Sequence, residues 1–400
     1  MLGLNVSLLL GMLVCCAGGV LSTPLCLAGD FDAQLQHILN TQVVSAQDPA
    51  RLISRVLDDV RATLSQRWQG FNLIPFGSLT LGVGTKSSDV DVALFIPDFN
   101  HSSALYFVEE TRQLLQKQPA LYIDLKSIIM PRLTRYSFIH IPTQQKVDLI
   151  FNLFKNGEEP VATSKLLGYY FRLDERNPNL ARFLKYLFQI HGLTGQETGR
   201  LISYTVYLLL IFYLQQKNMA PPVYVLQKDT KSVFFRNWDV SFNELSYNTT
   251  NTESLYQLLG GFFKYYSEFN FDEYIVSTYT GRPIPRSAIK DIDSLPKEHF
   301  LNNYFNRTIQ LKLKKELTCT DLCIQAPFYL SANKGERITH EYATKFKHLM
   351  KSVAKMFEYL PSDSILRAIL VVDEHKETVI NNNNATEHGL NENCIEVRNA

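Results

Sequence analysis

Residues 75–93 read PFGSLTLGVGTKSSDVDVA, and they hold the most informative pattern in the chain. Gly77 and Ser78 form a turn of small residues, and ten residues later a strand carries Asp89 and Asp91. Side chains alternate between the two faces of a strand. The apolar residues of this strand therefore point into a core, and both carboxylates point to the opposite face.

Two adjacent carboxylates on an apolar strand repel each other, and partial burial adds to the cost. A divalent cation removes that cost, and Mg²⁺ binds carboxylates while keeping positions for substrate phosphates. Residues 146–150 read KVDLI and place a third carboxylate, Asp148, away from the core. If the two strands are neighbours, three Asp converge on a two-metal site for phosphoryl or nucleotidyl transfer, and Asp148 helps to accept the proton.

The Gly-Ser turn complements such a site. We expect the turn to open a short helix, with Gly77 letting the backbone approach a phosphate and Ser78 binding β/γ-phosphate oxygens. A pair of carboxylates alone is more typical of a solvated edge strand. The upstream turn and Asp148 together favour the catalytic interpretation.

Length and composition set the outer limits. Four hundred residues with 46% hydrophobic side chains are enough for two folded domains. The formal net charge of +1 means that nucleic acid must be bound by local basic patches rather than by a global field. Apolar spacing and β-rich runs predict strands at 90–96, 121–129, 138–141 and 147–151, and helices at 30–66, 103–118, 180–191, 203–216, 252–268 and 339–359. The expected organisation is an apolar segment 1–29, a catalytic domain 67–160, a helical domain 30–66 plus 161–360, and a tail 361–400.

The N-terminal segment leaves the compartment open. Residues 6–20 are almost wholly apolar, which is shorter than the roughly 20 residues of a membrane-spanning helix. They resemble the core of a signal peptide, with a cleavage site at 26–28, but no positive residues precede them. Secretory, membrane or mitochondrial targeting and a tolerated extension all remain open.

The cysteines and the N-glycosylation triplets do not identify the cellular compartment either. Three of the six cysteines lie in this segment, and three remain downstream, an odd number that predicts no disulfide framework. Glycosylation triplets matter only if the chain enters the secretory pathway. They begin at Asn100, Asn248, Asn306 and Asn384.

The spacing of Gly77-Ser78, Asp89-Val90-Asp91 and Asp148 resembles that of the DNA polymerase β-like nucleotidyltransferases. Three further stretches resemble template-independent RNA terminal nucleotidyltransferases, a family of terminal uridylyltransferases and cytoplasmic-type poly(A) RNA polymerases. They are SLYQLLGGFFKYYSEFNFDEYIVSTYTGRPI (254–284), LISYTVYLLLIFYLQ (201–215) and LCIQAPFYLSAN (322–333). The resemblance covers roughly residues 30 to 360.

This resemblance implies an α+β fold, with a polymerase β-like palm, a mainly helical poly(A)-polymerase-associated domain and the nucleotide in the cleft between them. It also implies roles for single residues. Tyr204 would stack on the base, and Arg132 and Arg135 would lie near the RNA 3′ end. The other implied nucleotide contacts are Ser78, Thr163, Lys185, Ser203 and Asn333.

Three positions depart from the family pattern. Gln189 stands where a second lysine is frequent, Ala326 replaces an Asp, and Ala332 replaces the His that helps to select uracil. Base discrimination depends on polar groups that the wrong base leaves unpaired, so their loss weakens the expectation of UTP selectivity.

The leading expectation is a Mg²⁺- or Mn²⁺-dependent enzyme that adds UMP or AMP from UTP or ATP to RNA 3′-hydroxyl ends. Because no separate RNA-binding module is visible, a partner protein could supply RNA binding. The resemblance favours the cytoplasm, whereas the apolar N-terminus leaves membrane contact open. The alternative is a catalytically weak nucleotide- or RNA-binding protein that retains the fold. Transfer to a small molecule or a 2′-hydroxyl is a third hypothesis.

Overall fold

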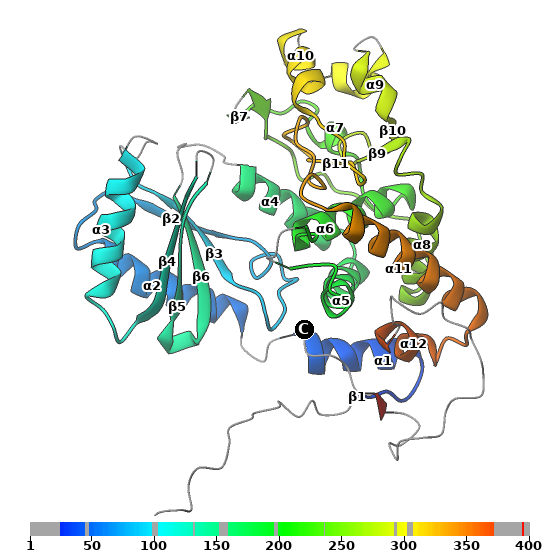
Figure 1. Cartoon of the computed structure of the whole chain (residues 1–400), viewed down its shortest axis with the longest axis horizontal. Coiled ribbons are helices and arrows are strands. Elements are labelled where there is room, and N and C mark those ends of the chain that lie inside the picture. Colours follow the sequence, from blue (N-terminus) through cyan, green and yellow to red (C-terminus); the bar gives the residue numbers. More distant parts are fainter. Residues whose placement is uncertain are drawn as a thin grey trace, which may run out of the picture.

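The computed structural model describes residues 25–44, 48–97, 103–130, 133–151, 159–195, 199–235, 237–291, 294–301, 307–371 and 394–395. They form two regions, each with its own hydrophobic core. Figure 1 shows a sheet-containing palm beside a larger, mainly helical region.

The palm is built on a five-stranded sheet in the order β2-β3-β6-β5-β4. In chain order the strands are β2 (Asn72–Phe76), β3 (Val90–Phe95), β4 (Tyr122–Met130), β5 (Leu133–His140) and β6 (Gln145–Phe151). β3 and β6 pair in parallel, and the other pairings are antiparallel. Val90 and Val92 of β3 and Val147 and Leu149 of β6 are buried in the palm core, as strand alternation predicts.

Two helices complete the palm core, α2 (Pro49–Leu64) and α3 (Ala104–Gln116). The side chain of Asp48 caps α2 by accepting a hydrogen bond from the Ala50 N–H. Leu52, Val56 and Val60, four residues apart, are buried against the sheet. The sequence assigned this helix to the helical domain. That assignment is wrong for α2, because its apolar stripe packs into the palm.

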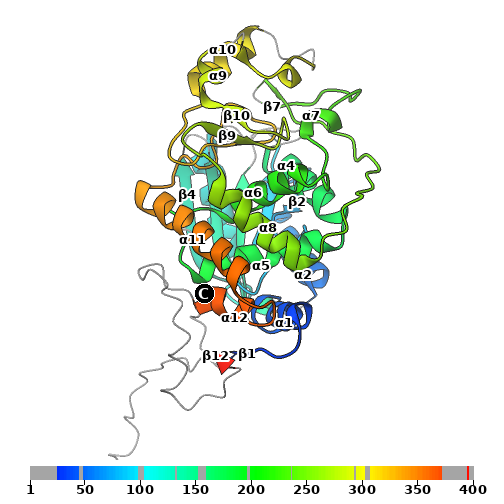
Figure 2. The same ribbon diagram turned by 90° about the vertical axis from the view of Figure 1, so that its right-hand side faces the viewer.

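The helical region consists mainly of α1 (Phe31–Ile38), with a π-turn at Leu39–Val43, α4 (Glu159–Arg172), α5 (Arg176–Ile190), α6 (Ser203–Gln216), α7 (Val223–Leu226), α8 (Leu255–Glu268), α9 (Arg286–Lys290), α10 (Arg307–Glu316), α11 (His340–Tyr359) and α12 (Ile365–Val371). α6 is apolar on all sides, which explains why it is buried from residue 205 to residue 215. Figure 2 shows α11 lying along α8. None of the helices in the described part of the chain combines the length and apolar character that a membrane crossing requires.

Short strands complete this region. β9 (Tyr274–Ser277) lies between β10 (Ile284–Pro285) and β11 (Ile324–Gln325). Two further pairs are β7 (Phe234–Phe235) with β8 (Trp238–Asp239), and β1 (Leu25–Cys26) with β12 (Cys394–Ile395). Single 3₁₀ turns occur at Ile141–Thr143 and Lys297–Leu301.

The two ends of the described chain differ from expectation. α12 is buried in the helical core, so the predicted tail from residue 361 begins with folded structure. Leu25 and Leu27 are also buried there, which argues against a cleavage site at 26–28. Residues 1–24 lie outside the described part.

The structure also contains disulfide bonds that the sequence analysis did not predict. Cys26 is bonded to Cys394 across 368 residues, and Cys319 is bonded to Cys323. Counting only the three cysteines downstream of residue 29 could not reveal the first bond, because Cys26 lies in the N-terminal segment and pairs with Cys394. The prediction of no disulfide framework is therefore wrong.

Candidate active site

The two predicted carboxylate strands are neighbours. β3 and β6 run parallel with Asp91 in register with Asp148, and Asp89 immediately precedes β3. Their apolar neighbours face the core, so these carboxylates lie on the opposite face. The expected pairing of the two strands is confirmed, and the alternation read from the sequence places their carboxylates on one face.

Gly77 follows β2 and makes room for a carboxylate. A Cβ at this position would lie 2.1 Å from Oδ2 of Asp91, and the backbone φ is +80°. A larger residue here would strain the backbone and displace the Asp91 carboxylate. The Gly77 N–H donates to Oγ of Ser164 at 3.0 Å, which joins the turn to α4. The predicted short helix does not form, since residues 78–82 make a turn closed by a hydrogen bond from the Leu81 N–H to the Gly77 carbonyl.

The three carboxylates of the site and Lys146 influence one another electrostatically. Burial, followed by repulsion from Asp148 and then Asp89, raises the pKa of Asp91 to about 7. Lys146 lies between the other two carboxylates, with Nζ 2.6 Å from Oδ2 of Asp89 and 3.8 Å from Oδ1 of Asp148. Within the described residues, no group of three or more His, Cys, Asp or Glu side chains is already arranged to hold a metal ion.

Asp148 is held in place from β5. Arg135 approaches its Oδ2 at 2.8 Å, and the Ser137 hydroxyl donates to its Oδ1 at 2.6 Å. The carboxylate is almost fully buried, with 6% of its side chain exposed. Arg135 was predicted to contact RNA, and here its guanidinium pairs with Asp148. Arg132 lies outside the described residues.

Ser88 links the palm to the helical region. Its hydroxyl accepts hydrogen bonds from Ser78 Oγ at 3.0 Å, from Lys185 Nζ at 2.8 Å and from the Thr85 N–H at 2.9 Å. Burial lowers the pKa of Lys185 to about 8, although Asp89 and Asp91 act in the opposite direction. Sequence reasoning missed Ser88. Its one signal was its position directly before the first carboxylate.

Comparisons with known proteins agree with this geometry. A family model described as "Poly(A) RNA polymerase, mitochondrial-like, central palm domain" matches residues 31–171, and one described as "Cid1 family poly A polymerase" matches residues 254–332. Together they match more than half of the chain. The chain belongs to the Cid1-like, PAP-associated family of RNA terminal nucleotidyltransferases.

Among curated relatives, human terminal uridylyltransferase 7 is 29% identical over 74% of this chain and 19% of its own length. The zebrafish (Danio rerio) poly(A) RNA polymerase GLD2 is 28% identical over 58% of this chain and 48% of its own length. The chain therefore spans less than half of either relative.

Two solved structures establish the fold. Mitochondrial poly(A) polymerase (mtPAP) in complex with UTP superposes with a TM-score of 0.71 at 20% identity, covering 86% of this chain and 71% of that one. A cytoplasmic RNA terminal U-transferase superposes with a TM-score of 0.65 at 20% identity, covering 84% of this chain and 97% of that one.

Four of the expected nucleotide contacts, Thr163, Lys185, Ser203 and Tyr204, lie on α4, α5 and α6. Thr163 of α4 is buried, and its Oγ1 has no hydrogen-bond partner within the described residues. Ser203 and Tyr204 begin α6. Lys334 Nζ lies 5.7 Å from the centroid of the Tyr204 ring. The roles assigned to these residues from the family resemblance stay predictions.

Residues 322–333, which resemble the nucleotide recognition loop of the family, are held in shape by Asn333. Its Oδ1 accepts from the Ile324 and Gly335 N–H groups at 2.9 and 2.8 Å. Its Nδ2 donates to the Thr318 carbonyl at 3.1 Å and to Thr320 Oγ1 at 3.3 Å. This amide can make four hydrogen bonds, and all four are made to residues in the loop or directly beside it. Its structural role is therefore clear, and its predicted contact with the nucleotide stays a prediction.

The three departures from the family pattern can also be located. Ala326 is fully buried, and its N–H donates to the Ala332 carbonyl at 3.0 Å, so both alanines close the recognition loop. Gln189, at the end of α5, lies within 3.4 Å of Ser87 Oγ. It provides an amide where a second lysine would provide a charge.

Proposed function

We propose that this protein is a template-independent RNA terminal nucleotidyltransferase that transfers UMP or AMP from UTP or ATP to an RNA 3′-hydroxyl. The observation that carries the proposal is the in-register pair Asp91 and Asp148, with Asp89 beside it and Gly77 leaving space for the Asp91 carboxylate. Such a pair costs stability unless a cation accompanies it.

The carboxylates suit a divalent metal ion. The Asp91 carboxylate makes no hydrogen bond or ion pair within the described residues, and burial, followed by the charges of Asp148 and Asp89, raises its pKa to about 7. Asp89, Asp91 and Asp148 would hold Mg²⁺ or Mn²⁺ through oxygen ligands. When bound, the metal would screen the charge of the triphosphate and make the 3′-hydroxyl more acidic.

The residues around the carboxylates have complementary tasks. Lys185 brings a buried positive charge beside Ser88 and Ser78, where it can neutralise phosphate oxygens. Arg135 and Ser137 hold Asp148 in one orientation, which favours catalysis by positioning. In the reaction the 3′-oxygen bonds to the α-phosphorus, the bond from that phosphorus to the bridging oxygen breaks, and pyrophosphate leaves. Asp148 is suited to take the proton of the hydroxyl.

The base preference remains UTP or ATP in this proposal. The relatives named above include both a uridylyltransferase and a poly(A) polymerase. Ala326 and Ala332 offer no side-chain hydrogen bonds to a base. RNA would be its substrate, and a partner protein could supply additional RNA binding.

One observation favours a second candidate, a nucleotide- or RNA-binding protein without efficient catalysis. Lys146 and Arg135 already neutralise Asp89 and Asp148 at 2.6 and 2.8 Å. In an active enzyme, metal and nucleotide must displace Lys146 from Asp89. A protein that only binds would retain this internal pairing.

A tailing assay separates the two candidates. The full chain is incubated with a labelled single-stranded RNA, Mg²⁺ or Mn²⁺ and each of the four nucleotides in turn. The proposal predicts stepwise 3′ extension with UTP or ATP, and loss of extension in the Asp89→Ala, Asp91→Ala double variant. Nucleotide binding without extension under all of these conditions would favour the binding protein.

A further inference from the structure

All four cysteines in the described part of the chain are paired. Cys26–Cys394 joins segments 368 residues apart, and Cys319–Cys323 closes a short loop before β11. Disulfides form and persist in oxidising compartments, whereas the cytosol keeps thiols reduced.

The Cys26–Cys394 bond holds part of the fold together. It joins β1 to β12, and each of these strands has only two residues. So short a ladder is not stable by itself. Leu25, beside Cys26, is buried in the helical core, and Ile395 packs against the same core. The covalent bond therefore fastens residues 394–395 to the body of the protein.

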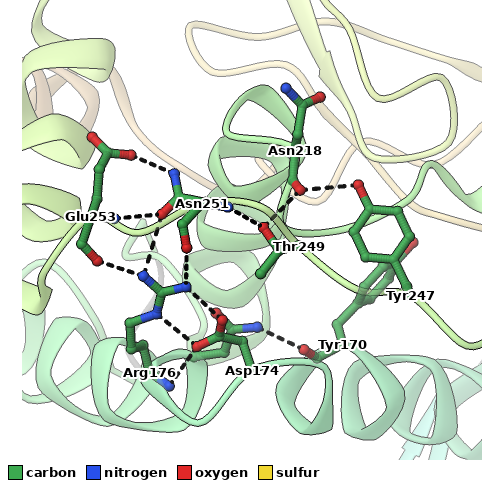
Figure 3. A network of polar contacts seen from close by, with 9 residues as sticks. Tyr170, Asp174, Arg176, Asn218, Tyr247, Thr249, Asn251 and Glu253 are labelled. Atoms are coloured by element: carbon green, nitrogen blue, oxygen red, sulfur yellow. Dashed lines mark hydrogen bonds and ion pairs between the residues drawn. The ribbon is translucent and has the colours of Figure 1, made fainter.

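An acceptor site for an N-linked glycan lies on the surface. Asn248 begins the triplet Asn248-Thr249-Thr250, its side chain is exposed, and the triplet belongs to an irregular stretch between β8 and α8. The Tyr247 hydroxyl and Thr249 Oγ1 both donate to the Asn218 carbonyl at 3.0 Å (Figure 3). With both neighbours bonded to the body of the protein, Asn248 is left facing solvent.

The stretch that carries Asn248 is well anchored. Farther along it, Arg176 at the start of α5 bonds to Asp174 and to the carbonyls of Asn251 and Glu253 (Figure 3). Asn248 itself makes no side-chain hydrogen bond within the described residues. A glycan on its amide would therefore extend into solvent without displacing any of the contacts that hold the loop.

We propose that this protein folds in the lumen of the secretory pathway and carries an N-linked glycan on Asn248. The amide nitrogen of Asn248 would form a bond to the anomeric carbon of an oligosaccharide, the pyrophosphate-linked lipid carrier would leave, and the amide would lose one proton. Each disulfide forms from two thiols, which pass two electrons and two protons to the thiol–disulfide exchange proteins of that compartment. The apolar residues 6–20 suit entry into this pathway.

Matched substitutions at Thr250 test the glycan, because the triplet accepts Thr or Ser at its third position but not Ala. The full chain is expressed in animal cells as the wild type, Thr250→Ala and Thr250→Ser. The peptide containing Asn248 is then analysed by mass spectrometry before and after enzymatic deglycosylation. We expect a glycan in the wild type and in Thr250→Ser, and complete loss in Thr250→Ala. A wild-type peptide that is unmodified in the recovered protein would overturn the proposal.

Thiol labelling provides the second readout. Denaturation without reductant, in the presence of a maleimide, should leave Cys26, Cys319, Cys323 and Cys394 unlabelled until a reductant is added. Prompt labelling of Cys26 and Cys394 would contradict a lumenal folding site. Neither readout involves RNA or nucleotide, so a failed tailing assay and a failed glycan test are distinguishable results.

Discussion

Asp91 on β3 lies directly opposite Asp148 on β6, in register across a parallel strand pair. Like charges at paired positions destabilise a sheet, and burial adds to the cost for both carboxylates. The pairing of Asp91 with Asp148 therefore lowers the free energy of unfolding of the palm. A site that binds a cation and a phosphate group explains why such an arrangement is retained.

Substitution of Gly77 tests the space that this pair needs. Gly77→Ala would place a methyl group against the Asp91 carboxylate, and we expect tailing activity to fall at least about 100-fold, as misplacement by about 1 Å does. Gly82→Ala is the control, because Gly82 has a similar φ of +70° and nothing within 4 Å of the added Cβ. Thermal melts should show a similar loss of about 1–2 kcal/mol from backbone strain in both variants. Equal activity of the two would refute the proposed contact.

Ser88 is predicted to position the triphosphate-binding lysine. Ser88→Ala removes the hydroxyl that accepts from Lys185 and Ser78, and we expect the KM for nucleotide to rise about tenfold, which corresponds to about 1.4 kcal/mol. Steady-state kinetics with varied nucleotide would measure this change. Ser87→Ala, at the exposed neighbouring position, should leave the KM unchanged. A KM effect of the same size in both variants would mean that the local turn, and not the Lys185 contact, is responsible.

Lys146 is predicted to compete with the metal. Lys146→Met removes the charge that lies 2.6 Å from Asp89. The half-saturating Mg²⁺ concentration should therefore fall about threefold to tenfold, which corresponds to about 0.7–1.4 kcal/mol of binding free energy. Mg²⁺ titrations of tailing rate at pH 8 would detect the shift. Lys126→Met removes an exposed ion pair with Asp124 and serves as the control. The proposed competition would be contradicted if only Lys126→Met lowered the half-saturating Mg²⁺ concentration. A higher half-saturating Mg²⁺ concentration in Lys146→Met would also contradict it.

Stability should depend on pH through His299. This side chain is fully buried, and burial lowers its pKa to about 4. The unfolded chain takes up a proton near pH 6.5 and the folded chain does not, so stability is lost as the pH falls below 6.5. Between pH 7 and pH 5 the loss should be about 2 kcal/mol, measurable by urea unfolding.

The matched variants for this experiment are His299→Gln and His340→Gln. The first should remove most of the pH dependence, whereas the second replaces an exposed histidine and should retain it. If His299→Gln lost as much stability between pH 7 and pH 5 as the wild type, other groups would be responsible.

The sequence predicted the carboxylates well because strand alternation is a local property. Asp91 and Asp148 could be placed on one face from their immediate neighbours, and the parallel pairing of their strands completed the site. Long helices with clear apolar spacing were also predicted closely. α6 begins and ends at Ser203 and Gln216, as expected.

What the sequence did not reveal depends on distant contacts. Ser88 looks like a loop serine until Lys185, 97 residues later, reaches its hydroxyl. Lys146 gave no sign that it would lie beside Asp89. The Cys26–Cys394 bond joins the two ends of the chain, so cysteine counting within one segment could not find it. The apolar stripe of α2 predicted a buried helix but not which core would bury it.

The most direct measurement compares Asp91→Asn with the wild type in both 3′ extension and thermal stability without metal. The substitution keeps the shape of the side chain and replaces the carboxyl group with a neutral amide. Burial, followed by the charges of Asp148 and Asp89, raises the pKa of that carboxyl group to about 7. We predict that RNA extension falls at least about 1000-fold while the melting temperature stays the same or rises, because functional carboxylates cost stability. Extension at the wild-type rate by a well-folded Asp91→Asn protein would contradict the proposed active site.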